Sequence, residues 1–293
     1  MSLNRPIWKV CDWFPISELD VGCLSQNPRA FSYLMEHPEE IDWRRLSANP
    51  SCDAIEYLRA FPQRIVVSWL VHNPSAECLP LIRERLHQLT ANDWCTLCKR
   101  DYAIDLLREN PDKIKWYMFS ENPAIFVKVD GKMQLRDWIS PGKLNFDALC
   151  SNPNAIDYVL QFPRKIKGFT FSMNPNAVPH LTRMPHLINW RSLALNPSPL
   201  AIQMLRENPD KIAFELLCSN PNPDAASLFR GVDSSLFNLE KLACNEGVFV
   251  LDYDAMRRNG ERLESEFIAE VMHPRRIFAD PSVDRIELLF GDE

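Results

Sequence analysis

The chain has 293 residues, 46% of them apolar and 25% charged, which is typical of a folded protein in water. Its net charge of −6 argues against nucleic-acid binding as its main role, because that binding depends on Lys and Arg neutralising phosphates. The longest apolar stretch, residues 65–71, is too short to cross a bilayer. The first residues lack the apolar core of a secretion signal, and nine cysteines, an odd number, favour a reducing compartment.

After a lead-in of residues 1–15, residues 16–246 contain an internal repeat written around the dipeptide Asn-Pro. An apolar residue precedes each anchor by three places, as Leu24 precedes Asn27. The ten anchors are spaced by 22 to 30 residues and are Asn27, Asn49, Asn73, Arg100, Asn122, Asn152, Asn174, Asn196, Asn220 and Asn245. Arg100 and Asn245 lack the following proline. Self-similarity at this period predicts a stacked array rather than one globular core.

Each repeat contains the start and stop signals of two short helices. Asn is a strong N-cap and Pro is favoured at the first helical position, so each Asn-Pro should begin a helix that ends at a second proline. A second helix follows, with an aromatic residue and a leucine on its core face, such as Trp43 and Leu46. Its expected N-caps are Asp20, Asp42, Asp93, Asn145, Asn189 and Asn238.

These signals predict an all-α fold, a solenoid of about ten units of 22–24 residues with a helical C-terminal cap. Each unit would be two short antiparallel helices, neither stable alone. With helices packed about 8–10 Å apart, ten units would form a curved rod about 90 Å long.

One repeat carries eight extra residues between Asn122 and Asn152. Alternating side chains around Asp130-Gly131 predict a β-hairpin at about residues 126–136. The hairpin is either a decorated loop or a projection that binds a partner. In the second case Asp130, Gly131 and Lys132 would contact the partner.

Residues 247–293 no longer follow the repeat and are interpreted as a helical segment that caps the last open face of the array. His273, Arg275 and Arg276 form a compact polar cluster there. Arg275 and Arg276 are candidate partner contacts. An acid–base relay of His273 with Asp252 or Asp254 is conceivable, but packing and ion pairs at a helix end explain the cluster better.

No other motif demands a chemistry. Cys95 and Cys98 form a single C-x-x-C, compatible with half a zinc site or a redox pair. However, Cys98 occupies the repeat position that Ser25, Ser47 and Ser120 occupy elsewhere, so a structural thiol in a small buried site is expected. We expect no catalytic residues, no metal and no cofactor, because the chain has no nucleophile elbow and no phosphate-binding loop.

The repeat resembles the Asn-Pro helical repeat proteins of giant, nucleocytoplasmic large DNA viruses. The resemblance is carried by NPDKIKW at 110–116, NPDKI at 208–212 and LCSNPNAI at 149–156. The ending is also similar, with LDYD at 251–254, EFI at 266–268 and HP at 273–274. The resemblance covers about residues 16–280 and implies a viral origin. The sequence departs from the Asn-Pro pattern of this family at Arg100-Asp101 and Asn245-Glu246.

The expected function is therefore a non-enzymatic scaffold for protein–protein interaction, of viral origin. The first interpretation is a structural component of the virion, such as a minor capsid protein. The alternative is an intracellular adaptor that binds host proteins. The expected partners are capsid or host proteins, with no nucleic acid, membrane span or small-molecule substrate. The expected location is the virion or the host cytoplasm, without secretion.

Overall fold

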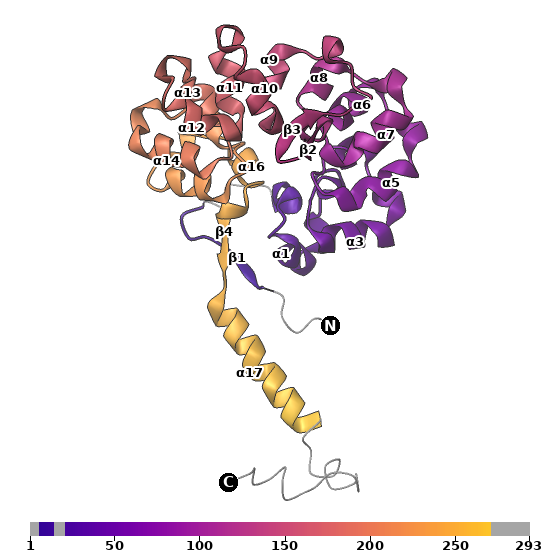
Figure 1. Cartoon of the computed structure of the whole chain (residues 1–293). Helices are drawn as coiled ribbons and strands as arrows, with labels where there is room; N and C mark the ends of the chain where they lie inside the picture. Colours follow the sequence, from indigo (N-terminus) through magenta and orange to yellow (C-terminus); the bar gives the residue numbers. More distant parts are fainter. Residues whose placement is uncertain (1–5, 15–20, 271–293) are drawn as a thin grey trace, which may run out of the picture. The chain divides into compact units, whose positions relative to one another are not determined.

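The computed structural model describes residues 6–14 and 21–270 (Figure 1). Most of these residues are helical, with a few short strands, which confirms the predicted all-α class. The chain forms two compact units, and each is described by itself. The larger unit holds the repeats and lies within residues 10–249, and the described part of the smaller comprises residues 6–9 and 250–270.

The first helix of a repeat follows the Asn anchor. The side-chain oxygen of Asn122, Asn152 or Asn174 caps a 3-10 turn whose first residue is proline, as the sequence predicts. At the other five Asn-Pro anchors the prediction was wrong. The N-cap position lies two residues after Asn49, Asn73, Asn196 and Asn220, at Ser51, Ser75, Ser198 and Asn222, and α1 begins at Phe31, after Ala30. The first helices are α1 (Phe31–Glu36), α3 (Cys52–Ala60), η5 (Ala76–Cys78) with α5 (Leu79–Arg83), η7 (Asp101–Ala103) with α7 (Ile104–Glu109), η11 (Pro153–Ala155) with α10 (Ile156–Val159), η13 (Pro175–Ala177) with α12 (Val178–Leu181), α14 (Pro199–Glu207) and η16 (Pro223–Phe229).

The second proline ends the first helix, as predicted. The residue before it leaves the helical region, with φ near −125° and ψ near 60° at Phe61 and Phe162, because the proline ring disfavours a helical residue there. The proline then begins a short 3-10 turn, the proline turn. The turns at this position are η3 (Pro38–Glu40), η4 (Pro62–Arg64), η6 (Leu86–Gln88), η8 (Pro111–Lys113), η10 (Pro141–Lys143), η12 (Pro163–Lys165), η14 (Pro185–Leu187), η15 (Pro209–Lys211) and η17 (Ser234–Leu236), of which η6 and η17 lack proline.

The second helix follows the turn. Asp42, Asn145, Asn189 and Asn238 are its N-caps, as predicted. The prediction for Asp93 was wrong, because Thr90 begins that helix one turn earlier and Asp93 completes a capping box with it. Asp20 lies outside the described residues. The second helices are η2 (Val21–Gln26), α2 (Trp43–Ser47), α4 (Val67–Leu70), α6 (Ala91–Cys98), α8 (Trp116–Ser120), α9 (Phe146–Leu149), α11 (Gly168–Met173), α13 (Trp190–Leu193), α15 (Phe214–Leu217) and α16 (Leu239–Leu242).

The predicted hairpin replaces a first helix after η9 (Pro123–Ile125). Strand β2 (Phe126–Val129) pairs antiparallel with β3 (Lys132–Leu135), so that Val129 lies opposite Lys132. Asp130 and Gly131 both have positive φ, 48° and 79°, as a two-residue hairpin turn requires.

The Asn anchors form a buried hydrogen-bond ladder between repeats. In each case the side-chain oxygen accepts from the backbone N–H two residues later, as Asn152 does from Asn154 at 2.9 Å. The Nδ2 group donates to two backbone carbonyls of the preceding repeat, which for Asn152 are those of Ser120 and Asn122, at 3.0 and 2.8 Å. Seven further Asn residues make the equivalent pair of bonds: Asn27, Asn49, Asn73, Asn122, Asn174, Asn196 and Asn220. Asn245 also donates to two carbonyls of the preceding repeat, but to those of Asn220 and Asn222.

The ladder closes on itself. Asn27, the first anchor, donates to the carbonyls of Ala243 and Asn245 at 2.7 and 2.8 Å, so the first repeat stacks on the last. The ion pairs Arg29–Glu246 and Arg45–Glu240, at 3.2 and 3.1 Å, join the same two ends. The prediction of a curved rod was therefore wrong for residues 10–249, which form a closed ring in which α16 returns to the first repeat (Figure 1).

Both chain ends contribute to the tenth repeat. Asn245 begins η18 (Glu246–Val248) and β4 (Phe249–Leu251), whereas η2 takes the place of that repeat's second helix. Strand β1 (Trp8–Val10) pairs with β4, and the Cys11 N–H donates to the Val248 carbonyl at 2.9 Å. The first repeat therefore covers the tenth. The predicted capping segment, residues 247–293, lies in part outside the described residues. In the smaller unit α17 (Tyr253–Glu270) follows Asp252, whose side chain caps it.

Arg100 replaces one Asn of the ladder. Its guanidinium donates to the carbonyls of Val71 and His72, and the Tyr102 hydroxyl donates to the Asn73 carbonyl at 2.9 Å. Arg100 and Tyr102 together thus provide the donors for the buried carbonyls at this junction, whereas one Asn provides them at the other junctions. The departure from the sequence pattern therefore leaves the ring continuous.

We predict that Asn152→Asp lowers the free energy of unfolding by about 2–4 kcal/mol. Aspartate keeps the cap, but it loses both donors to the Ser120 and Asn122 carbonyls and places a charge in a fully buried site. Urea unfolding measures the change. Asn92→Asp makes the same chemical change at an exposed site and should alter the stability by less than about 0.5 kcal/mol. Equal effects of the two variants would contradict a structural role of the ladder.

Gly168 allows close contact between α11 and the proline turn of the next repeat. A Cβ atom there would lie 2.3 Å from the Leu187 carbonyl oxygen, whereas one at Gly142 would meet nothing within 4 Å. We predict that Gly168→Ala lowers the free energy of unfolding by about 1–3 kcal/mol. Thermal unfolding of Gly142→Ala is the matched control. A neutral Gly168→Ala would show that the two repeats are not packed as described.

Candidate binding surface

The predicted partner contacts of the hairpin are all at its exposed tip. Asp130, Gly131 and Lys132 are exposed, and Val129 beside them retains 41% of its accessible surface. At the base, Phe126 is buried and the Arg136 guanidinium donates to the Ala124 carbonyl, which anchors the hairpin. The tip is therefore available for contact. Arg275, Arg276 and His273 lie outside the described residues.

The Asn-Pro loops converge on the interior of the ring. A cavity of about 280 Å³ is lined by loops of five consecutive repeats around the closure, from Ser219 to Pro74. Repeats that are not neighbours can line one cavity only if their loops face the centre of the ring. The loop residues that line it include Gln26, Pro28, Pro50, Pro74, Ser219, Pro221 and Glu246.

Two further cavities, of about 530 and 380 Å³, lie against the second helices α4, α6 and α8. His72 and Thr96 line both, so the two cavities are contiguous. Burial, together with the Arg100 guanidinium, lowers the pKa of His72, and the imidazole is therefore neutral at pH 7. Trp69, Asn92 and Asp93 line the larger cavity, which thus combines an aromatic face with hydrogen-bonding groups.

The second helices expose one position that differs in chemistry from repeat to repeat. It lies five residues before each ladder residue, and in no repeat from the second helix α2 onward is it buried. Ser68 and Cys95 at this position line the cavities of about 530 and 380 Å³, respectively. Its occupants are Arg44, Ser68, Cys95, Tyr117, Asp147, Phe169, Arg191, Glu215 and Glu240. By contrast, the position three residues before the ladder is always a buried Leu or Phe.

Ion pairs connect several of these side chains around the ring. Asp147 binds Lys167, and Arg191 binds Glu215 at 2.9 Å. Lys99 binds Glu121 at 2.8 Å in the same way between neighbouring repeats. Exposed pairs of this kind contribute little to stability, at most about 1 kcal/mol each.

Cys98 has the structural role that its repeat position predicts. The side chain is fully buried, and its Sγ accepts the backbone N–H of Lys115 at 3.3 Å. Ser25, Ser47, Ser120 and Ser172 accept the equivalent N–H with their hydroxyls. Burial raises the pKa of the Cys98 thiol, whereas a redox-active C-x-x-C has a lowered one.

The structure also gives roles to the acidic residues near the chain end. Asp252 caps α17 through the Ala255 N–H, and Asp254 pairs with Arg257 at 3.0 Å.

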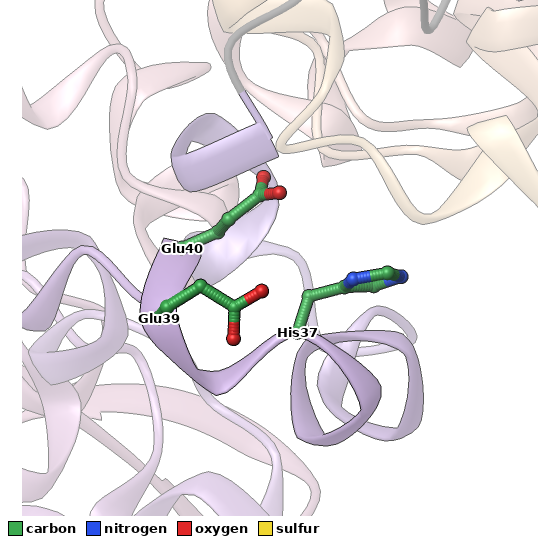
Figure 2. Close-up of side chains that lie close together, drawn as sticks. All are labelled: His37, Glu39 and Glu40. Atoms are coloured by element: carbon green, nitrogen blue, oxygen red, sulfur yellow. The ribbon is translucent and has the colours of Figure 1, made fainter.

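Elsewhere in the described chain, His37, Glu39 and Glu40 place possible metal-ligand atoms within 4.8 Å of one another (Figure 2). His37 follows α1, and Glu39 and Glu40 lie in η3. Both carboxylates are exposed to water, so the geometry alone gives no argument for a bound metal.

No family model, curated protein or solved structure matches the chain. Within the described residues, no helix has both the length and the apolar character needed to span a bilayer.

Sequence reasoning recognised the Asn anchors as helix caps but missed their second role. Asp, Ser and Thr cap helices as well as Asn does, yet none of them occurs at an anchor. Only an amide combines an acceptor for the cap with two donors for the carbonyls of the preceding repeat. The choice of Asn at nine of the ten anchors was the signal for the ladder.

We predict that thiol alkylation at pH 8 separates the cysteines by exposure. Cys52 is exposed and should react in the native chain, whereas Cys98 and Cys218 should react only after unfolding. Burial raises the pKa of both buried thiols, and the thiolate is the reactive form. Peptide mass spectrometry locates the modified residues. Native alkylation of Cys98 as fast as that of Cys52 would contradict the structural assignment.

Proposed function

We propose that the chain is a non-enzymatic scaffold that binds other proteins through its ring of repeats. The observation that carries the proposal is the contrast between two sets of repeat positions. Ladder residues and core leucines are buried and nearly invariant from repeat to repeat, whereas the variable position of the second helix carries cations, anions, aromatic rings, one serine and one cysteine. Repeat proteins that recognise partners combine a fixed framework with such a variable surface.

The closed ring supports this use. An open array can gain or lose repeats at its ends, but a closed ladder fixes the number of units and holds each exposed side chain in a set place. A preformed surface loses less conformational entropy on binding than a flexible one does. The ring is therefore suited to recognition of a structured surface or segment.

We further propose that the scaffold is a structural component of a virus particle, such as a minor capsid protein. The resemblance of the repeat to giant-virus proteins motivates this role. The alternative is an adaptor that binds host proteins in the infected cell. Both roles use the same surface. They differ in the place where the chain accumulates, the particle or the infected cell, and in its copy number there.

Quantitative mass spectrometry of purified particles, beside the infected-cell lysate, separates the two roles. A structural component should be present in particles at a high and fixed copy number. Absence from particles, with abundance in the lysate, would favour the adaptor. The scaffold proposal itself would be contradicted if the full-length chain neither entered particles nor gave cross-links to any other protein in the lysate.

A further inference from the structure

One sector of the ring has the opposite charge to the rest of the chain. Residues 111–191 contain eleven Lys and Arg against six Asp and Glu, a net charge of +5 in a chain whose net charge is −6. Lys115, Lys143, Lys165 and Lys167 in this sector are all exposed. A concentrated field of one sign attracts a partner of the other sign and raises its rate of association.

Aromatic rings hold two of these lysines in place. The Lys143 ammonium lies 4.9 Å from the centre of the Trp116 ring, and that of Lys165 lies 5.9 and 5.2 Å from Phe146 and Phe162. Both lysines belong to proline turns and stand over the second helix of the preceding repeat. They therefore form a row with a spacing of one repeat.

Lys115 and Lys167 occupy a position where the fold favours a different residue. They are the N-cap residues of α8 and α11, and neither side chain caps its helix. Asp42, Asn145, Asn189 and Asn238 do so in other repeats. A lysine here loses the cap and places a cation at the positive end of a helix. Local choices that oppose the fold are expected at functional sites.

Two large apolar side chains are exposed next to these lysines. Tyr117 and Phe169 follow Lys115 and Lys167 by two residues and retain 49% and 59% of their accessible surface. Helix α9 lies between them in the chain order of second helices, and its Asp147 binds Lys167. Exposed aromatic residues within a charged frame are the usual anchors of protein interfaces.

We propose that Lys115, Tyr117, Lys143, Lys165, Lys167 and Phe169 form a docking patch for an acidic protein segment that also carries apolar side chains. This inference deepens the proposed function and rests on it. The carboxylates of the segment bind the lysines, and its apolar side chains pack on Tyr117 and Phe169. A protein segment suits the patch better than a nucleic acid, because Asp147 lies within it and the remainder of the chain is strongly acidic.

The test selects a random peptide library, displayed on phage, on the immobilised full-length chain. We expect the enriched peptides to be acidic and to contain apolar residues. Tyr117→Ala and Phe169→Ala should each weaken their binding at least about tenfold. Leu236→Ala, at a residue with 56% exposure outside the patch, is the matched control and should leave the affinity unchanged.

A second pair of variants separates binding from folding. Lys115→Asn and Lys167→Asn restore the N-cap of other repeats, so each should keep or raise the melting temperature while it weakens peptide binding. Val66→Asn restores the missing cap of α4, outside the patch, and should leave binding unchanged. A loss of binding in a variant that is no less stable than the wild type cannot be ascribed to misfolding.

The remaining outcomes overturn the inference in distinguishable ways. Peptides that bind equally to the wild type and to all patch variants would place the binding site elsewhere and leave the scaffold proposal intact. Enrichment of no peptide, together with the absence of cross-linked partners in the lysate, would contradict both. If oligothymidylate bound the chain and lost its affinity in the patch variants, while peptides did not bind, the patch would be a nucleic-acid site.

Discussion

The structure of the ring depends on the need to satisfy every buried backbone group where one short repeat meets the next. The α-helices of the ring, α1 to α16, are four to nine residues long, so most of their end groups lie at junctions between repeats. A single Asn side chain answers this need by capping its own repeat and donating to two carbonyls of the preceding one. Because the amide is fully buried, these bonds are formed away from competing water.

Closure follows from the same interaction. Each ladder residue specifies how one repeat stacks on the previous one, and ten such steps complete a turn, at an average rotation of about 36° per repeat. The last step uses the same pair of bonds as the others, from Asn27 to Ala243 and Asn245. The tenth repeat is built from both ends of the chain, so that folding of the ring requires the ends to meet. The fold constrains the residues of the ladder and the core, but it leaves the residue type at the exposed positions open. The proposed binding function depends on this variation among the exposed residues.

Much of the local structure could be predicted from the sequence. The sequence predicted the helix starts at Asn122, Asn152 and Asn174, the helix ends before the second proline, four of the second-helix caps and the Asp130-Gly131 hairpin. All of these depend on short-range backbone preferences that residue types reveal directly. Closure could not be predicted, because the rotation per repeat is set by side-chain packing between units. The role of Gly168 could not be predicted for the same reason, because a Cβ is excluded there only by the close approach of the Leu187 carbonyl from the next repeat. The hairpin tip was identified as a candidate contact from its turn signal, whereas the patch around Tyr117 and Phe169 requires knowledge of which aromatics the core leaves exposed.

The most direct test of the account is whether the first and last repeats touch in solution. Arg45→Lys makes the Arg45–Glu240 ion pair, 3.1 Å long, accessible to zero-length carbodiimide coupling. Lys99–Glu121 and Lys167–Asp147 join neighbouring repeats in any arrangement, open or closed, and serve as internal references within the same sample. A closed ring predicts a link between position 45 and Glu240 within one monomer, at a yield comparable to that of the references. Efficient coupling of both references without the link to Glu240 would show that the array is open and contradict the account.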